Sequence, residues 1–405
     1  MKYRIFLIVA IFGALLSCEK EISTSQADKF LKNYGNYLSG EASDVDVLDD
    51  GGFAICGTDS TAEFGKRMML IVTDSYGNME SGFPKYFTKE GMESGANSVE
   101  AIRGSQGGYM LFGFVESEIE GTLETQKDMF VVKANSSGEE LWQRTYGSIE
   151  DEVILHATQR TSSGYMLAGY QVKEGKSDIL VMGIKEEGDS IPLGLNYHNP
   201  YAENSAASYI LNHGDSYLCV CTYDKLGEEG TDLLILNINE DMDVFPENLT
   251  DELDEVGVCA IEDGRAIVDG PDRFLVLGNR MSVSRRMEMV IYLIETEGFS
   301  ITKSLQLATI SQSNTDLTGR RFVKTDDGRY AIVGTRQVSG SSEIFLQFLT
   351  SDYLVSGNVS FGASGTQTGA DIEISEDGGF VILGTNGYKK HSMISLIKTS
   401  DTGDL

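Results

Sequence analysis

Apolar residues along this chain fall into short runs that recur at a nearly constant spacing. The two most similar runs are GGYMLFGF at 107–114 and SGYMLAGY at 163–170. Anchoring on the aromatic residue of this segment gives seven copies, separated by 56, 56, 52, 57, 56 and 50 residues. Seven copies at one period predict a repeat architecture. The seven anchors are Phe53, Tyr109, Tyr165, Tyr217, Phe274, Tyr330 and Phe380.

Each copy contains the pattern of four short strands. In the second copy these strands are predicted at 96–102, 109–114, 128–133 and 141–146. The third strand is mostly apolar in every copy, as in DLLILNI from Asp232, which is typical of strands buried on both faces. Four strands in about fifty-five residues predict a blade. We therefore expect an all-β fold, a seven-bladed β-propeller of four-stranded antiparallel blades over residues 29–405.

The two ends of the chain supply a test of ring closure. The last repeat stops at 402–405, just after its third strand. The missing strand is matched near the N-terminus, where FLKNYG at 30–35 resembles LWQRTYG at 141–147. We predict that this N-terminal strand completes the last blade, which would hide two sheet edges.

The first residues have the pattern of a targeting segment. Lys2 and Arg4 precede an apolar run at 5–16, which is too short to span a bilayer and suits a signal-peptide core. The sequence LLSC at 15–18 resembles the lipobox of bacterial lipoproteins, and this resemblance implies cleavage before Cys18 and acylation of its thiol. Residues 1–17 are then a lipoprotein signal peptide and 18–28 a lipidated tether. An ordinary secretory signal with a chance cysteine is the alternative.

The repeat also resembles a known group of proteins. Its pattern of a turn, Gly-Tyr-apolar-Gly, then Asp-apolar-Lys, then Trp-x-x-x-Tyr-Gly is similar to secreted β-propeller repeat proteins and lipoproteins of Bacteroidota, over roughly 30–405. The acidic cluster Glu19-Lys20-Glu21 resembles the surface-export signal of such lipoproteins. The resemblance implies a lipid anchor in the outer membrane of a Gram-negative bacterium, on the periplasmic or the exposed side. Most members have no assigned activity, and Trp142 is the only Trp here, so most copies depart from the pattern at that position.

The net charge limits the kinds of partner that the chain can bind, and the positions of its cysteines argue against disulfides. The formal net charge is −30, so nucleic acid would be repelled, and contact with the membrane is expected only through the lipid anchor. The four cysteines after Cys18 all lie in apolar strand-like runs and are expected to be small buried residues rather than a disulfide framework. They are Cys56, Cys219, Cys221 and Cys259.

Variable loops mark one candidate binding face. Loops between the second and third strands, and links between blades, differ most among the copies, and in a propeller both emerge on the same face. The loop at 116–128 is acidic, and the loop at 279–288 is the densest basic stretch. A partner that carries both charges could bind the acidic and the basic loop together, although charged loops are more often simply solvated. The candidate residues are Glu116, Glu118, Glu120, Glu124, Arg280, Arg285 and Arg286.

Metal, cofactor and catalytic motifs are not found. Asn237, Asn239, Asp241 and Asp243 alternate but lack the glycine and the bidentate glutamate of a calcium loop. Asp44 and Asp46 alternate on the first predicted strand and could line the central channel, although one blade does not make a ring of ligands. No nucleophile elbow, phosphate loop or metalloprotease motif is present, so neither a metal nor a cofactor is predicted.

Two main functions remain open. The leading hypothesis is a non-enzymatic envelope lipoprotein, a propeller module that binds or scaffolds a protein or glycan partner. The alternative is a polysaccharide-active propeller enzyme of the envelope, a glycosidase or lyase with carboxylates around the central funnel. A purely structural role in a larger envelope complex is a third reading.

Overall fold

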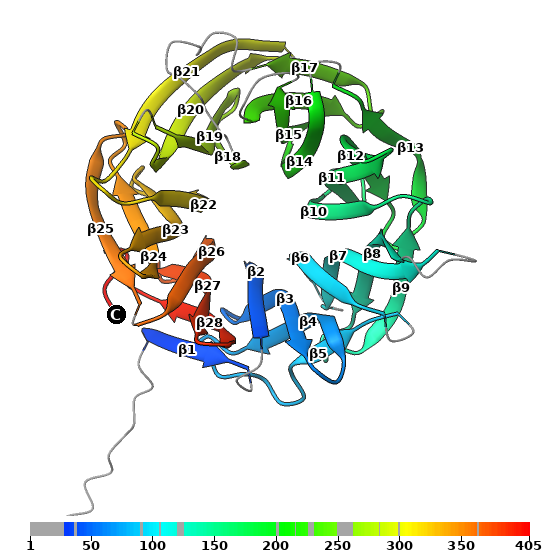
Figure 1. The fold of residues 1–405 in the computed structure, drawn as a ribbon, viewed down its shortest axis with the longest axis horizontal. Coiled ribbons are helices and arrows are strands. Elements are labelled where there is room, and N and C mark those ends of the chain that lie inside the picture. Colours follow the sequence, from blue (N-terminus) through cyan, green and yellow to red (C-terminus); the bar gives the residue numbers. More distant parts are fainter. Residues whose placement is uncertain are drawn as a thin grey trace, which may run out of the picture.

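Seven four-stranded antiparallel sheets are arranged around a central channel in the computed structural model (Figure 1). The fold is a seven-bladed β-propeller, which confirms the predicted architecture. The first strand of each blade lines the channel and the fourth lies at the rim. The structure describes residues 28–35, 39–89, 92–104, 107–119, 125–199, 202–214, 216–225, 231–248, 262–282, 284–298, 300–362 and 364–405.

The first four blades follow the chain without interruption. Blade one contains β2 (Ser39–Val47), β3 (Phe53–Thr61), β4 (Gly65–Thr73) and β5 (Lys85–Phe87). Blade two contains β6 (Ser94–Ala101), β7 (Tyr109–Glu118), β8 (Thr125–Ala134) and β9 (Glu140–Tyr146). Blade three contains β10 (Glu152–Gln159), β11 (Tyr165–Lys173), β12 (Lys176–Ile184) and β13 (Ser190–Tyr197). Blade four contains β14 (Ala202–His213), β15 (Ser216–Lys225), β16 (Thr231–Asn239) and β17 (Val244–Asn248).

The last blade joins both ends of the chain. Blade five contains β18 (Glu262–Gly270), β19 (Arg273–Met281), β20 (Met287–Glu297) and β21 (Ser300–Ile310). Blade six contains β22 (Leu317–Lys324), β23 (Tyr330–Val338), β24 (Ser341–Leu349) and β25 (Val355–Phe361). Blade seven contains β26 (Thr366–Ile374), β27 (Phe380–Tyr388), β28 (His391–Lys398) and the N-terminal strand β1 (Phe30–Tyr34).

Strand β1 closes the ring, as predicted. It pairs antiparallel with β28, with Phe30 opposite Lys398 and Tyr34 opposite Ile394. The Tyr34 hydroxyl donates to the Gly77 carbonyl oxygen at 2.7 Å, which ties this strand to blade one as well. The N-terminal segment therefore connects the last blade to the first.

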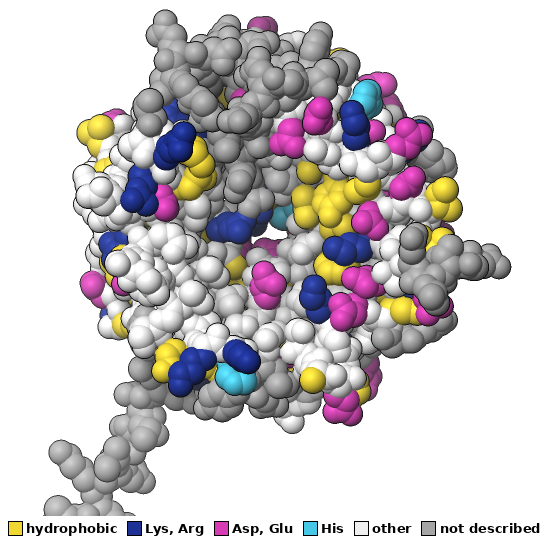
Figure 2. Space-filling view, in the orientation of Figure 1, with side chains coloured by type: hydrophobic (Ala, Val, Ile, Leu, Met, Phe, Trp, Pro, Cys, Tyr) yellow, Lys and Arg dark blue, Asp and Glu magenta, His cyan; other side chains and the backbone are white. Residues whose placement is uncertain are grey.

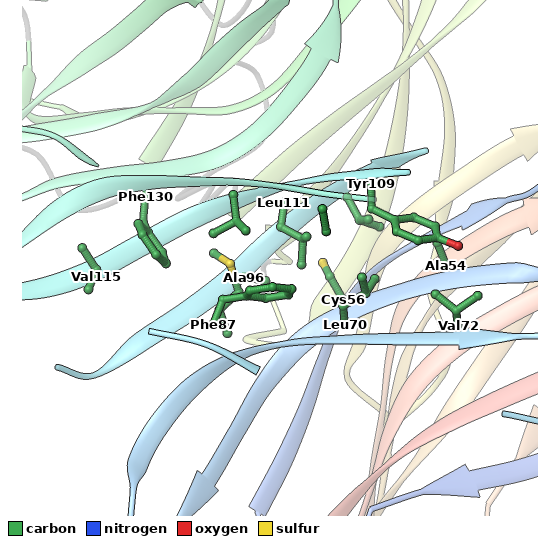
Figure 3. Packing of buried hydrophobic residues seen from close by; sticks show 14 residues of the cluster. Ala54, Cys56, Leu70, Val72, Phe87, Ala96, Tyr109, Leu111, Val115 and Phe130 are labelled. Carbon is green, nitrogen blue, oxygen red and sulfur yellow. The ribbon is translucent and has the colours of Figure 1, made fainter. Parts of the chain in front are cut away.

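Hydrophobic side chains pack between neighbouring blades rather than in one central core. Each of the seven clusters joins two adjacent sheets. Between blades one and two, Cys56, Leu70, Phe87 and Phe130 pack face to face and are 5% exposed or less (Figure 3). A single blade has two apolar faces, so only its neighbours can bury both of them.

Buried cysteines and repeat aromatics behave as the sequence predicted. Cys56, Cys219 and Cys221 are free thiols with no exposed surface, while Cys259 lies outside the described residues. All seven anchor aromatics are buried at the start of the second strand of their blades. The described part of the chain contains no helix long and apolar enough to cross a membrane. The predicted signal peptide and almost all of the tether, Cys18 included, also lie outside the described residues.

Candidate functional site

A β-bulge interrupts the channel-lining strand of all seven blades at the same place. In blade six the pairing shifts between Gly319 and Arg321, and in blade seven between Gly369 and Asp371. A bulge inserts one extra residue and re-aims the side chain that follows it. The residue after the bulge is thus equivalent in all seven blades, and we call these seven residues the channel ring. They are Asp44, Ser98, His156, Tyr209, Arg265, Arg321 and Asp371.

The repeated glycine of the sequence pattern explains the bulge. Gly169 lies on β11 opposite the bulge of β10, and a Cβ atom there would stand 1.8 Å from the Val153 carbonyl oxygen. At Gly113 in blade two the equivalent distance to the Gly95 oxygen is 2.0 Å. At these positions a Cβ atom would overlap a backbone oxygen, so glycine is required there. Blade four has Cys221 at the equivalent position and forms its bulge without a glycine. Gly57, Gly334 and Gly384 occupy the same position and meet a backbone carbonyl oxygen in the same way.

The channel ring surrounds a polar cavity of about 160 Å³. Figure 2 shows a hollow at the centre of the ring, with basic, acidic and histidine side chains on its wall. The lining residues come from the second half of the innermost strands, so the cavity lies nearer to the tight turns that join first and second strands. This is the face opposite to the one that the variable loops favoured. The lining residues are Asp44, Val45, Asp46, Val99, Glu100, Arg103, His156, Thr158, Tyr209, Ile210, Leu211, Arg321 and Glu373.

Two aspartates of the ring bind the backbone of the next blade. Asp371 Oδ2 accepts a hydrogen bond from the Val45 amide at 3.0 Å, and Asp44 Oδ2 accepts one from the Val99 amide at 2.9 Å. The two carboxyl groups also share a hydrogen bond. Burial, followed by the neighbouring Asp371 charge, raises the pKa of Asp44 well above its usual range. Asp44 and Asp371 therefore join blades seven, one and two through backbone amides, and the raised pKa of Asp44 reduces the repulsion between the two adjacent carboxyl groups.

Arg321 is the central cation of the site. Its Nε lies 3.2 Å from Asp371 Oδ1 and its Nη2 lies 3.8 Å from Glu373 Oε1. Its Nη1 lies 3.3 Å from His156 Nε2, and its guanidinium carbon lies 4.6 Å from the centre of the Tyr209 ring. Because a guanidinium group only donates, His156 Nε2 accepts this hydrogen bond.

His156 is held neutral beside Tyr209. Burial, reinforced by the charge of Arg321, lowers the pKa of His156 well below its ordinary value. No hydrogen bond of good geometry reaches Nδ1 within the described residues, although the backbone of Ile210 lies close enough to oppose part of this shift. The centres of the His156 and Tyr209 rings are 4.0 Å apart, and burial raises the pKa of Tyr209 to about 12. Both rings therefore carry a proton and no charge near neutral pH.

Two groups in the cavity keep their hydrogen-bonding capacity for a ligand. Tyr209 is 7% exposed, yet its hydroxyl has no hydrogen-bond partner among the described residues. The Glu100 carboxyl likewise has no hydrogen bond or ion pair in that part of the chain, and burial raises its pKa to about 7. A hydroxyl or carboxyl group on the wall of a cavity can bind water or a ligand there. Burial and the Asp371 charge also raise the pKa of Glu373, to about 8.

The acidic candidates from the sequence lie on strands more than on a loop. Glu116 and Glu118 belong to β7, where they pair with Lys127 and Thr125 of β8, so these strands extend beyond the predicted loop boundaries. Glu120 and Glu124 lie outside the described residues. None of the five loop candidates that the structure describes lines the cavity.

The basic candidates are not equivalent to one another. Arg280 lies on β19 with its side chain buried, and its Nε donates to Glu288 Oε1 at 2.7 Å, so its charge is used inside blade five. Arg285 is exposed in the turn after β19, where its φ is 57°. Arg286 is exposed as well, with Nη1 3.3 Å from Asp316 Oδ2.

No group of three or more potential metal ligands is found in the described ranges. Asn239 and Asp243 instead form the ordinary turn between β16 and β17, where the Asp243 amide donates to Asn239 Oδ1 at 2.8 Å. Asp44 and Asp46 do line the channel, as the sequence suggested, but they do so together with arginines and a histidine from other blades.

Sequence reasoning missed six of the seven ring residues because it used the repeat to count strands and not to align single positions. In five blades the ring residue lies nine positions before the anchor aromatic, as His156 does before Tyr165. The offset is eight in blade four and eleven in blade two, because the turns after the first strand differ in length. Counting back from the aromatic would have identified His156, Arg265, Arg321 and Asp371.

Comparisons with known proteins match the fold alone. No protein-family model matches the chain, and no curated protein is significantly similar to it in sequence. A polysaccharide lyase of family PL25, an ulvan lyase bound to a sulfated disaccharide repeat, superposes with a TM-score of 0.58 at 9% identity, over 91% of this chain and 96% of that one. A puromycin hydrolase superposes with a TM-score of 0.55 at 11% identity over 91% of this chain, which spans only 53% of the hydrolase.

Proposed function

We propose that the protein is a non-enzymatic binding module of the bacterial envelope, held in the outer membrane through a lipid on Cys18. Its partner is an envelope glycan or protein, and the central cavity is its binding site. The observation that supports this proposal is that two polar groups on the cavity wall are free to bind a ligand. The Tyr209 hydroxyl and the Glu100 carboxyl lack hydrogen-bond partners among the described residues. Similar polar groups converging in a concave site are typical of ligand pockets.

The dimensions of the cavity favour a glycan over a protein. Protein partners bind through surfaces of about 800 Å² on each side, whereas this cavity is small and concave. A sugar offers many hydroxyl groups that both donate and accept, which suits a wall of carboxyl, guanidinium and phenol groups. The exposed Arg285 and Arg286 then remain available for a protein contact at the rim.

A glycan array probed with the mature chain tests this function. We expect a defined set of glycans to bind, and Tyr209→Phe to weaken binding because it removes the free hydroxyl and keeps the ring. The matched control is Tyr146→Phe, since Tyr146 lies on β9 at the rim and donates to Gly188 outside the cavity. Absence of any glycan ligand, together with pulldown of an envelope protein that Tyr209→Phe does not affect, would contradict the cavity as the binding site.

One observation favours the enzymatic alternative. The neutral His156 ring and the Tyr209 phenol lie side by side, and such a pair could accept and donate a proton during elimination from a uronate polysaccharide. Against this, an elimination needs a cation to neutralise the substrate carboxylate, and Arg321 already pairs with Asp371.

Incubation with uronate polysaccharides tests the enzymatic alternative. Ultraviolet absorbance of the unsaturated product would establish a lyase, and new reducing ends without that absorbance would establish a glycosidase. We expect neither signal. Activity that disappears in His156→Gln but persists in Tyr146→Phe would replace the binding proposal with the enzymatic one.

A further inference from the structure

We infer that the central cavity receives one uncharged sugar residue, the end of a glycan chain, with the Tyr209 hydroxyl and the Glu100 carboxyl as its hydrogen-bonding partners. This inference deepens the proposed function and rests on it. It specifies the charge and the size of the ligand, which the proposed binding function does not.

The charges around the cavity favour an uncharged ligand. Arg265 and Arg321 flank Tyr209, so a cationic ligand would be repelled at that wall. The opposite wall carries carboxyl groups from blades seven, one and two, and burial raises the pKa of Glu100 to about 7 and that of Glu373 to about 8, so much of this wall is uncharged near neutral pH. Five carboxyl groups and three guanidinium groups lie in and around the cavity, and the formal net charge of −30 opposes the approach of anionic chains from a distance. The five acids are Asp44, Asp46, Glu100, Asp371 and Glu373.

The existing ion pairs leave little capacity for a charged ligand. Arg321 is already bound to Asp371, and Arg103 Nη2 lies 2.6 Å from Asp46 Oδ1. Breaking a partly buried ion pair to bind a new charge leaves the old partner uncompensated. Tyr209 and Glu100 can bind a hydroxyl group without breaking any contact of the described residues.

The volume sets the size of the ligand. A cavity of about 160 Å³ holds roughly five waters at about 30 Å³ each. Pockets for drug-sized ligands begin at about 300 Å³, so an extended oligosaccharide does not fit inside. A single terminal residue enters the cavity while the rest of the chain stays in solvent.

Calorimetric titration with paired ligands tests this inference on the intact mature chain. The probes are neutral oligosaccharides of glucose, galactose or mannose and their uronic acid counterparts of equal length, titrated from about pH 5 to about pH 9. We expect a neutral ligand to bind at least tenfold more tightly than its charged counterpart. Affinity for the neutral ligand should rise as pH increases through about 7, because a ligand hydroxyl donates more strongly to ionised Glu100.

Two substitutions separate the roles of the partners. Glu100→Gln should remove the rise in affinity near pH 7, since the amide accepts a hydrogen bond but does not titrate. Tyr209→Phe should weaken binding about fivefold at every pH, the usual loss for one neutral hydrogen bond. The matched controls are Tyr146→Phe at the rim and Glu139→Gln in the exposed turn between β8 and β9, and neither should change affinity.

The outcomes distinguish the inference from the function on which it rests. Tighter binding of the uronate ligand, an affinity that falls as pH rises through 7, or an unchanged affinity of Tyr209→Phe would overturn the inference and leave a cavity that binds some other ligand. If no probe of either class binds, the inference and the proposed glycan-binding function are both wrong.

Discussion

At the residue scale, one glycine in the repeat sets the direction of a functional side chain. Gly169 has no side chain because the Val153 carbonyl oxygen occupies that space, and the bulge that results points His156 into the channel. The glycine that makes the repeat recognisable is therefore also the residue that builds the channel ring.

Replacing this glycine should destabilise the fold strongly. In Gly169→Ala the new Cβ would lie 1.8 Å from a backbone oxygen that no rotamer change can move. We expect a loss of roughly 3 kcal/mol in the free energy of unfolding, measured by chemical denaturation. Gly270→Ala in β18 is the control, because its nearest neighbour would be the Arg273 side chain at 3.7 Å, and it should be close to neutral.

The carboxyl groups of the channel predict how stability depends on pH. The pKa of Glu373 is raised to about 8 by burial and then by the Asp371 charge, above the value of 4.5 expected for an unfolded chain. Glu373 therefore contributes stability that is complete below about pH 4.5 and is lost as pH rises through about 8. Glu373→Gln should raise the melting temperature at pH 9 relative to wild type and flatten its pH profile between these values.

Glu343→Gln, which removes a charge on β24 that pairs with Arg336 outside the channel, is the control for this profile. It should leave the slope between pH 4.5 and 8 unchanged. A wild-type melting temperature that rises over that interval, after correction for the control, would contradict the assigned role of Glu373.

At the scale of elements, β1 is the one strand among the described residues that the chain supplies out of order. Its five residues pair with β28, and Tyr34 is buried against blade one. Without this strand, the apolar face of β28 and its hydrogen-bonding edge would be open to solvent.

Removing β1 should open the ring. A chain that begins at Ser39 is expected to melt at a lower temperature than one that begins at Asp28 and to self-associate through the free edge of β28, which light scattering would detect. The substitution Tyr34→Ala should cost about 3 kcal/mol or more through loss of a buried aromatic ring and its hydrogen bond to Gly77. Leu31→Ala on the same strand is the control, since Leu31 is 45% exposed. Equal melting temperatures for both truncated chains would argue against closure by β1.

The sequence predicted the elements better than it predicted the site. The apolar runs and the repeated aromatic residues follow from local periodicity, so the strands, the seven blades and the closing strand could all be read directly. The predicted loop at 116–128 began too early because Glu116 and Glu118 are polar, yet they continue strand β7 at its more exposed end. The cavity could not be predicted, because the ring residues of different blades lie more than fifty positions apart on average and share no common side-chain chemistry.

At the scale of the whole molecule, the proposed anchor lies next to the strand that closes the ring. Only a short polar tether separates Cys18 from β1, so the propeller would remain close to the membrane. The high negative charge would keep the folded domain from binding anionic lipid directly.

The lipid anchor predicts where the protein is found in the cell. Cys18→Ser should move the protein from the membrane fraction to the soluble fraction, because acylation of the thiol is the only proposed membrane contact. Cys56→Ser is the control for loss of a cysteine; it removes a buried thiol within the fold and should leave the fractionation unchanged. Membrane association that survives Cys18→Ser would show that another part of the chain holds the protein there.

The bulge in each innermost strand places seven equivalent side chains at the same level along the central axis, and each can be substituted separately. Because the bulge recurs with seven ring residues of different chemistry, and even opposite Cys221 in blade four, the side chains at the centre can change through point substitutions while the sheets stay the same. Counting back nine residues from the anchor aromatic gives the ring residue in five blades, whereas blades two and four need offsets of eleven and eight. The complete ring is aspartate, serine, histidine, tyrosine, arginine, arginine and aspartate.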